Sequence, residues 1–154
     1  MKAYFSRRYH LSASHRLHTG ALSEEANRTT YGKCNNPFGH GHNYIIEVCV
    51  SGPVDPETGM VLNLAELDLI VQREILSRYD HTNLNTLKEF EHLVPTTENL
   101  CIAVYDRVNV AITSAQLERV RVEETENNFF EYSGKQRSSS VAAGTKGHPS
   151  WPNQ

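Results

Sequence analysis

Four segments of the chain are predicted to be strands, and residues 4–14 and 117–124 among them show the period of two that is typical of strands that bury one face. In the first segment Tyr9, Leu11 and Ala13 fall on one side. The second is strongly β-prone and ends at Ser51-Gly52-Pro53. An Asn127-Asn128 turn separates the last two. The pattern predicts strands at residues 4–14, 42–50, 117–124 and 129–132. A further short strand is predicted at residues 60–62.

Two other segments have apolar residues spaced by three and four, which is typical of amphipathic helices. The first follows Asn63, a good N-cap, and Glu66 completes a capping box. It should end near Tyr79. The second should begin at Thr96 or Thr97, just after Pro95. Their apolar stripes are Leu64, Leu67, Val71 and Ile75 in the first helix, and Leu100, Ala103, Val104, Val108 and Ala111 in the second.

The predicted order is strand, strand, helix, helix, strand, strand. This order favours an α+β domain with two helices on one face of an antiparallel sheet of four strands. Residues 19–41 are polar and should form a loop, or a short helix plus a loop, and a connection this long is usually functional. In residues 133–154, ten of the 22 residues are Gly, Ser or Pro. We therefore predict a domain at 1–132 and a flexible C-terminal tail at 133–154.

Composition narrows the classes of protein to be considered. The 154 residues are 38% hydrophobic and 21% charged, which suits one soluble domain. A net charge of −3 and the absence of any Lys/Arg run argue against a nucleic-acid partner. No apolar stretch approaches the roughly 20 residues of a membrane span, and the first residues lack a signal-peptide core. Three cysteines are too few and odd in number for a disulfide framework, so we expect a cytoplasmic protein. We also expect no membrane partner.

Three of the eight histidines carry the strongest chemical signal. His40 and His42 are two residues apart, so in an extended segment both imidazoles point to the same side. His15 ends the first predicted strand, and antiparallel pairing could bring it alongside them. Three imidazoles without a fourth protein ligand form an open site, which is the pattern of catalytic zinc rather than structural zinc.

Other interpretations of these histidines remain open at this point. The Gly39-His40-Gly41-His42 segment could be a polar turn, because a His-x-His pattern is short and common. His10 and His18 flank His15 and could replace it as ligands. His10 has odd spacing from His15 and should face the other way along one strand. His92 and His148 have no local partner in the sequence and are predicted to be solvated.

Cys34 lies in a polar loop six residues before His40. Lys33 and a nearby zinc ion would both lower the pKa of its thiol and favour the thiolate. The residue could then be a general base or a nucleophile. It could also be a fourth zinc ligand or an ordinary loop cysteine. Cys49 and Cys101 fall in a predicted strand and helix, where small core residues are expected.

Two acidic groups complete the candidate site. Asp80 directly precedes His81, and a carboxylate beside a histidine can fix its tautomer. Glu123, Glu124 and Glu126 cluster at the end of a strand. One buried carboxylate there could accept two N–H bonds from a guanidine-like ring edge, whereas a solvated hairpin tip is the default alternative.

Together these segments resemble the 6-pyruvoyl-tetrahydropterin synthase family. The most specific is Cys-Asn-Asn-Pro-Phe-Gly-His-Gly-His-Asn-Tyr at residues 34–44. The other matching segments are residues 11–17, 22–27, 55–61, 79–84, 95–100 and 124–128. The resemblance covers about residues 4 to 133. Phe38 at a variable position, Glu126 in place of a commoner Asp or Pro, and the additional tail are the departures from the family.

The resemblance implies a tunnelling fold, in which three subunits join their sheets into a barrel and two trimers stack into a homohexamer with active sites between subunits. It implies 7,8-dihydroneopterin triphosphate as the pterin substrate, elimination of triphosphate and an internal redox transfer in tetrahydrobiopterin biosynthesis. It also implies Mg2+, with the triphosphate, besides catalytic Zn2+. By the same resemblance His15, His40 and His42 are the zinc ligands and Cys34 is the base. Asp80 and His81 are its relay partners, Glu124 anchors the pterin, and Thr96, Thr97 and Glu98 line the pocket.

Two alternatives accompany this interpretation. A 6-carboxy-tetrahydropterin synthase of deazapurine biosynthesis is the nearer one, but there the cysteine typically lies closer to the His-x-His pair. Five residues separate Cys34 from His40 here. The other is a zinc- or pterin-binding protein that has lost catalysis, which the intact Cys34, Asp80, His81 and Glu124 disfavour.

Overall fold

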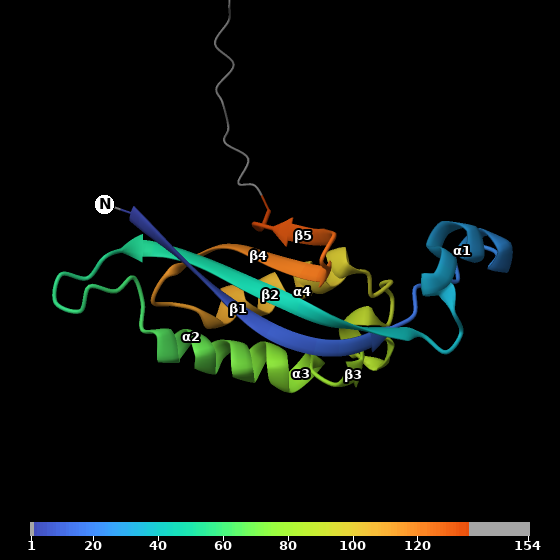
Figure 1. Ribbon diagram of the computed structural model, residues 1–154, viewed down its shortest axis with the longest axis horizontal. Helices are drawn as coiled ribbons and strands as arrows, with labels where there is room; N and C mark the ends of the chain where they lie inside the picture. The colour runs from blue at the N-terminus through green and yellow to red at the C-terminus, as the bar shows by residue number, and fades with distance from the viewer. Residues whose placement is uncertain (1, 136–154) are drawn as a thin grey trace, which may run out of the picture.

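Two long strands, β1 (Lys2–His15) and β2 (His40–Pro53), form the centre of the sheet in the computed structural model, which describes residues 2–135 (Figure 1). They pair antiparallel along their full length, from Lys2 opposite Pro53 to His15 opposite His40. This register matters for function because it brings the end of β1 against the beginning of β2.

Three more strands complete the sheet in the order β3-β1-β2-β4-β5. β4 (Gln116–Thr125) runs antiparallel to β2, and β5 (Asn128–Tyr132) runs antiparallel to β4. The four predicted antiparallel strands are therefore present. A fifth strand, β3 (Thr82–Asn83), pairs parallel with β1 and makes the sheet mixed. It is two residues long, too short to leave a periodic pattern in the sequence.

The helices lie on one side of the sheet (Figure 1). The first predicted helix runs from α2 (Leu64–Val71) through a π-helical turn at Gln72–Leu76 to α3 (Ser77–Tyr79), so its predicted end is confirmed. The second is α4 (Thr97–Ala111). Short 3₁₀ turns at Leu84–Thr86 and Lys88–Phe90 connect them. Within residues 2–135, none of the helices has the length and apolar character that crossing a bilayer requires.

The long connection between β1 and β2 is a short helix plus a turn, as predicted. α1 (Glu24–Tyr31) begins at the N-cap Ser23, whose side chain accepts from the Ala26 amide, and a 3₁₀ turn follows at Gly32–Asn35. The connection lies beyond one end of the sheet (Figure 1). It carries Cys34 back toward the end of β1.

The core lies between the helices and one face of the sheet. Alternate residues of the strands point into it, and these include Leu11, Ala13, Tyr44, Ile46, Val48, Val50, Val120 and Val122. The other face is polar, and no described helix covers it. There Glu47 is 8% exposed and accepts hydrogen bonds from Arg8 and Arg119 at 3.0 and 2.7 Å.

The prediction of a short strand at residues 60–62 was wrong. These residues follow a turn in which Asp55 donates its amide to the Met60 carbonyl at 3.0 Å and accepts from Gly59 at 2.8 Å. The turn leaves residues 60–62 outside the sheet.

Near the end of the described residues, Gly134 adopts φ +81 against the ring of Tyr105. Residues 136–154 of the predicted tail lie outside the described residues, so the domain boundary stays a prediction.

Candidate metal and pterin site

Strand register alone brings the three predicted zinc ligands together. His15 pairs with His40, and Ala13 pairs with His42, so the three imidazoles project from the same face. One ligand nitrogen from each ring lies within 4.8 Å of the others. The Nε2 atoms of His15 and His40 are 3.1 Å apart. Two nitrogens bound to one tetrahedral zinc at about 2.05 Å would be separated by about 3.3 Å, so this spacing fits a shared metal ion.

A glycine permits the close approach of the two strands. Gly39 has φ +71, and a Cβ atom there would fall 2.9 Å from the carbonyl oxygen of His15. Any other residue would collide with that backbone and strain its own conformation. Gly39 therefore directs the chain into β2 with His40 directly opposite His15.

The orientation of His15 is fixed by a segment far away in the sequence. Its Nδ1 atom lies 2.7 Å from the carbonyl oxygen of Pro95, just before α4. Because a carbonyl only accepts, Nδ1 carries the proton and Nε2 keeps its lone pair. The side chain is 1% exposed. Such a contact to the outer nitrogen is the usual way in which proteins orient a ligating histidine.

Burial favours the neutral form of His15 and His42, which is the form that metal binding needs. Burial lowers the pKa of His15, and His40 and His42 lower it further, while the bond to Pro95 opposes them. Burial also lowers the pKa of His42, against the opposing effect of Glu124. Among residues 2–135, His42 Nε2 has no hydrogen-bond partner although it is buried. A lone pair in that position suits a metal ion, so the three residues fit zinc.

Glu124 lies against this cluster at the end of β4. Its Oε1 atom is 3.5 Å from His42 Nε2 and 3.8 Å from His15 Nε2. Burial raises the pKa of Glu124, but hydrogen bonds from Asn128 and Thr97 and the nearby histidines outweigh it and lower the pKa below its ordinary value. Asn128 Nδ2 donates at 3.0 Å. The carboxylate is therefore ionised, oriented and only 19% exposed.

Cys34 lies in the 3₁₀ turn beside the end of β1. Its carbonyl accepts from the amide of Leu17 at 2.8 Å, two residues beyond His15. We predicted that Lys33 and zinc would lower the pKa of the thiol. In the chain without metal the direction is the opposite, because burial and then the charge of Glu124 raise the pKa. Lys33 next in sequence contributes nothing that offsets them.

Asp80 and His81 form the predicted pair, but away from Cys34. The Ser12 amide donates to Asp80 Oδ1 at 2.8 Å, and His81 Nδ1 lies 3.0 Å from Asp80 Oδ2. His81 adopts φ +56, and its side chain is 82% exposed. In the described part of one chain, no hydrogen bond or ion pair joins this pair to Cys34.

The three residues at the start of α4 differ in their relation to the cluster. Thr96 is the N-cap and accepts from the Asn99 amide at 3.3 Å. Thr97 is 8% exposed, and its side chain bonds to Glu124. Glu98 is exposed on the first turn. The family resemblance implies that all three line the pocket, and among them only Thr97 acts on Glu124, as one of the groups that lower the pKa of its carboxyl.

Comparisons with known proteins agree with this geometry. The family model described as "6-pyruvoyl tetrahydropterin synthase" matches residues 4–135. The human 6-pyruvoyl tetrahydrobiopterin synthase is 44% identical over 135 residues, which cover 87% of this chain and 93% of the human protein. This chain belongs to the 6-pyruvoyl tetrahydropterin synthase family. It is therefore an enzyme, a lyase, and the resemblance noted in the sequence is confirmed.

A solved structure and a relative with another activity also match this chain. The Caenorhabditis elegans 6-pyruvoyl tetrahydropterin synthase structure has a TM-score of 0.84 and 39% identity, and the match covers 88% of this chain and 97% of that one. A putative 6-carboxy-5,6,7,8-tetrahydropterin synthase of Archaeoglobus fulgidus is 39% identical over 92 residues, which cover 60% of this chain and 73% of its own length. The pyruvoyl relatives thus match over more of the chain.

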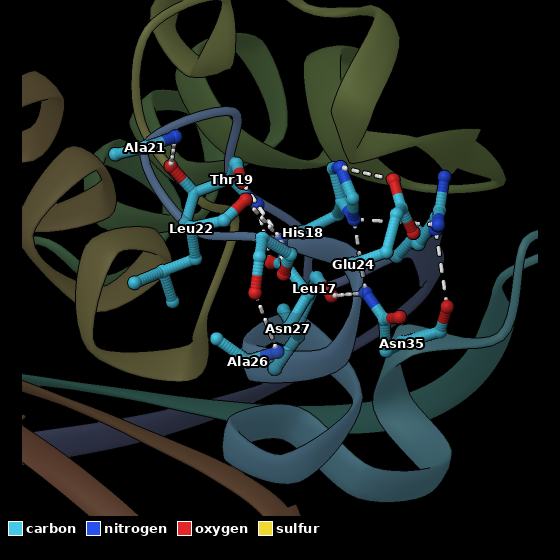
Figure 2. Close-up of polar contacts among 11 residues, drawn as sticks. Leu17, His18, Thr19, Ala21, Leu22, Glu24, Ala26, Asn27 and Asn35 are labelled. Carbon is cyan, nitrogen blue, oxygen red and sulfur yellow. Dashed lines mark hydrogen bonds and ion pairs between the residues drawn. The ribbon is translucent and has the colours of Figure 1, made fainter.

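Sequence reasoning missed the polar scaffold that holds this family's cysteine segment in place. Asn27 is fully buried, accepts from the Thr19 amide at 2.9 Å and donates to the carbonyls of Thr19 and Leu22 (Figure 2). Asn35 donates to the Leu17 carbonyl at 2.8 Å. Asn27 lies in the polar helix α1 and Asn35 in the 3₁₀ turn, and neither segment has an apolar stripe that marks its buried side, so their burial could not be predicted from the pattern.

Proposed function

We propose that this enzyme converts 7,8-dihydroneopterin triphosphate to 6-pyruvoyl-tetrahydropterin in tetrahydrobiopterin biosynthesis. Family membership supports a lyase of this class. The observation that supports the site assignment is the convergence of three imidazoles, with a carboxylate 3.5 Å from His42 and a cysteine on the adjoining turn. These residues are the proposed metal ligands, anchor and base.

The proposed reaction is balanced within the substrate. A proton leaves the second side-chain carbon, the bond from the third carbon to the triphosphate oxygen breaks, and the resulting enol becomes a methyl ketone. The remaining side-chain alcohol is oxidised to a ketone by two electrons, and the C6–N5 imine of the ring takes up the same two electrons and two protons. No external reductant is needed.

The roles of the chain's residues follow from their positions. His15, His40 and His42 would hold Zn2+, which supplies Lewis-acid stabilisation of an enolate-like charge when it is bound. Cys34 accepts a proton from the side-chain carbon. Because burial and Glu124 raise the pKa of Cys34, this base needs a nearby cation or a proton acceptor to reach the thiolate.

Glu124 anchors the pterin in this proposal. The pterin edge presents an amino group and a ring N–H side by side, and a carboxylate can accept both in a bidentate arrangement. Thr97 and Asn128 already orient the carboxylate, so little ordering is required on binding. Thr96 and Glu98 are proposed to line the same pocket.

Assembly into a homohexamer is proposed to complete the active site. The exposed His81 and its partner Asp80 would reach Cys34 of a neighbouring copy, because they make no contact with Cys34 in their own chain. β1 offers an edge for this assembly, since β3 covers only Ala13 and Ser14. An exposed edge of this length is normally paired or protected. Three sheets joined at such edges would form the barrel of the tunnelling fold, and two trimers would stack.

Further proposals concern a second metal ion, the cellular location and the C-terminal segment. Mg2+ would accompany the triphosphate, as a hard cation with oxygen ligands. A cytoplasmic location is proposed from the three free cysteines. The segment 133–154 is proposed to be a tail outside the catalytic domain.

Product identification tests the proposal. The zinc-loaded protein is incubated with 7,8-dihydroneopterin triphosphate and Mg2+, and products are identified by mass spectrometry, with Cys34→Ala in parallel and Cys49→Ala as the matched control. We expect triphosphate and a product that keeps all three side-chain carbons, lost only in Cys34→Ala. A product shortened to a one-carbon carboxylate would identify the 6-carboxy enzyme instead. Zinc binding without turnover would identify a binding protein.

A further inference from the structure

A cavity of about 240 Å³ lies between the end of β1, helix α1 and the 3₁₀ turn, and Lys33 and Asn35, the two sequence neighbours of Cys34, line it. It is separate from the histidine cluster and from the Glu124 carboxylate. The lining residues that matter here are Arg16, Glu24, Arg28, Lys33, Asn35 and Asn36. Three of these six side chains are cations.

The cations are not neutralised by carboxylates of the described chain. Within residues 2–135, neither Arg16, Arg28 nor Lys33 forms an ion pair with an acidic side chain. Glu24, the acidic group of the lining, is 70% exposed and lies 3.9 Å from His18. Three like charges around one cavity repel one another, in a protein whose net charge is −3. An anion in the cavity would remove that repulsion.

The cavity wall is held in place before any ligand arrives. Arg16 Nε donates to the carbonyl of Asn35 at 3.1 Å, and its outer nitrogen lies 3.3 Å from His18 Nδ1. Asn35 Nδ2 also lies 3.1 Å from that nitrogen of His18 (Figure 2). The guanidinium is therefore fixed by its neighbours and keeps its remaining N–H groups for a ligand. Binding to such a group loses little rotamer freedom.

A second cavity adjoins this one on the side of His15. This second cavity of about 320 Å³ shares Arg16 and Pro37 with the first and is also lined by the zinc ligand His15. The backbone bond from Leu17 to Cys34 joins the two walls. A molecule held at the histidines could thus extend past Arg16 toward Arg28 and Lys33.

We propose that this cavity binds the triphosphate group of the substrate, with Arg16, Arg28 and Lys33 as its cationic contacts. The inference rests on the proposed function for the identity of the substrate. Guanidinium groups match phosphate oxygens through paired hydrogen bonds, and a lysine adds a mobile point charge. The position beside Cys34 places the leaving group next to the residue proposed to start the elimination.

Inorganic triphosphate tests the cavity without any turnover. Its affinity for the zinc-loaded protein is measured by calorimetry for wild type, Arg28→Gln, Lys33→Gln and the double variant. The control is Lys88→Gln, which removes a lysine from the 3₁₀ turn Lys88–Phe90, outside this cavity. We expect the affinity to fall about threefold to tenfold for each single variant and about thirtyfold for the pair, and to stay unchanged for Lys88→Gln. Arg28→Lys should keep most of it, and thermal melting checks that each variant folds.

Two outcomes would overturn the proposal. One is an affinity for inorganic triphosphate that the double variant leaves unchanged. The other is equal weakening by Lys88→Gln, which would mean a general effect of charge. With the full substrate, KM should rise in the double variant while the affinity for 7,8-dihydroneopterin, which lacks the triphosphate, stays the same. If the wild-type protein turns over the substrate but the double variant binds inorganic triphosphate as tightly as wild type, this site alone is refuted. If the wild-type protein binds triphosphate in the cavity but shows no turnover, the proposed function alone is refuted.

Discussion

Oε1 of Glu124 lies 3.5 Å from Nε2 of His42, so one carboxylate borders the three-histidine cluster. The two residues come from neighbouring strands, β4 and β2, and both face the helices. Thr97 and Asn128 hold the carboxylate from the other side. The carboxylate and the histidines are therefore held in fixed positions relative to one another.

Glu124→Gln tests the role of this carboxylate as the pterin anchor. The amide keeps the shape but can accept only one of the two N–H bonds, so the affinity for 7,8-dihydroneopterin should fall about tenfold to a hundredfold. Calorimetry measures it, and the zinc content should stay unchanged. Glu123→Gln is the control, because Glu123 pairs with Arg8 and Arg121 on the other face. Equal affinity of Glu124→Gln and wild type would refute the anchor.

His42→Ala tests the three-histidine cluster. Two imidazoles hold zinc much more weakly than three, so zinc affinity should fall more than about a hundredfold. A competition titration with a chromophoric chelator measures this affinity. His92→Ala, at an exposed position, should bind zinc like wild type. If the two variants behaved alike, His42 would not be a ligand.

Mixed oligomers test whether the active site is shared between copies. Cys34→Ala and His81→Ala should each be almost inactive. Coexpression should restore about a quarter of wild-type activity, because that fraction of sites would combine an intact Cys34 with the partner's intact His81 in random mixing. Activity of the separately purified variants and of the coexpressed mixture gives the comparison. No recovery in a mixture that does assemble would place both residues in one chain.

The acid stability of the domain should depend on Glu89. Its carboxylate accepts from Arg78 and Tyr79 at 2.6 and 2.9 Å, and the bond from Arg78 is the main reason that its pKa falls from 4.5 to about 2. A lowered folded-state pKa stabilises the protein above about pH 4.5, and this stabilisation is lost as the pH falls toward 2. Glu89→Gln should therefore cost about 1 kcal/mol at pH 7 and progressively less below pH 4.5.

Denaturant unfolding at pH 7, 4 and 3 measures this difference. Glu91→Gln, two residues away on an exposed position, should show no such pH-dependent loss. A difference between wild type and Glu89→Gln that is the same at every pH would contradict the assigned pKa.

The sequence predicts the local elements well because each leaves a periodic signal. The period-two pattern of β1 places His15 at its end, and the Asn63 and Thr96 caps mark where two helices begin. His40 was expected in the loop at residues 19–41, whereas β2 begins at His40, two residues earlier than predicted. The contact of His15 with Pro95, the buried Asn27 and the two-residue strand β3 were not predictable in this way. Each of them depends on partners that only the folded chain brings together.

The π-helical turn at Gln72–Leu76 shows the same limit within a helix. The apolar stripe predicts a helix through to Tyr79, and the structure confirms it. Inside it, Arg107 of α4 donates to the Glu74 carbonyl at 2.9 Å, a contact that the stripe does not reveal. A stripe of apolar residues cannot distinguish these two kinds of turn.

The most direct test of the whole account is the return of activity with zinc. The protein is stripped of metal with a chelator, and the 6-pyruvoyl product is followed as zinc is added back with Mg2+ present throughout. The account predicts no product without zinc, and full activity when one zinc ion is bound per chain. Undiminished turnover in the metal-free protein, or binding of zinc that His42→Ala does not weaken, would contradict it.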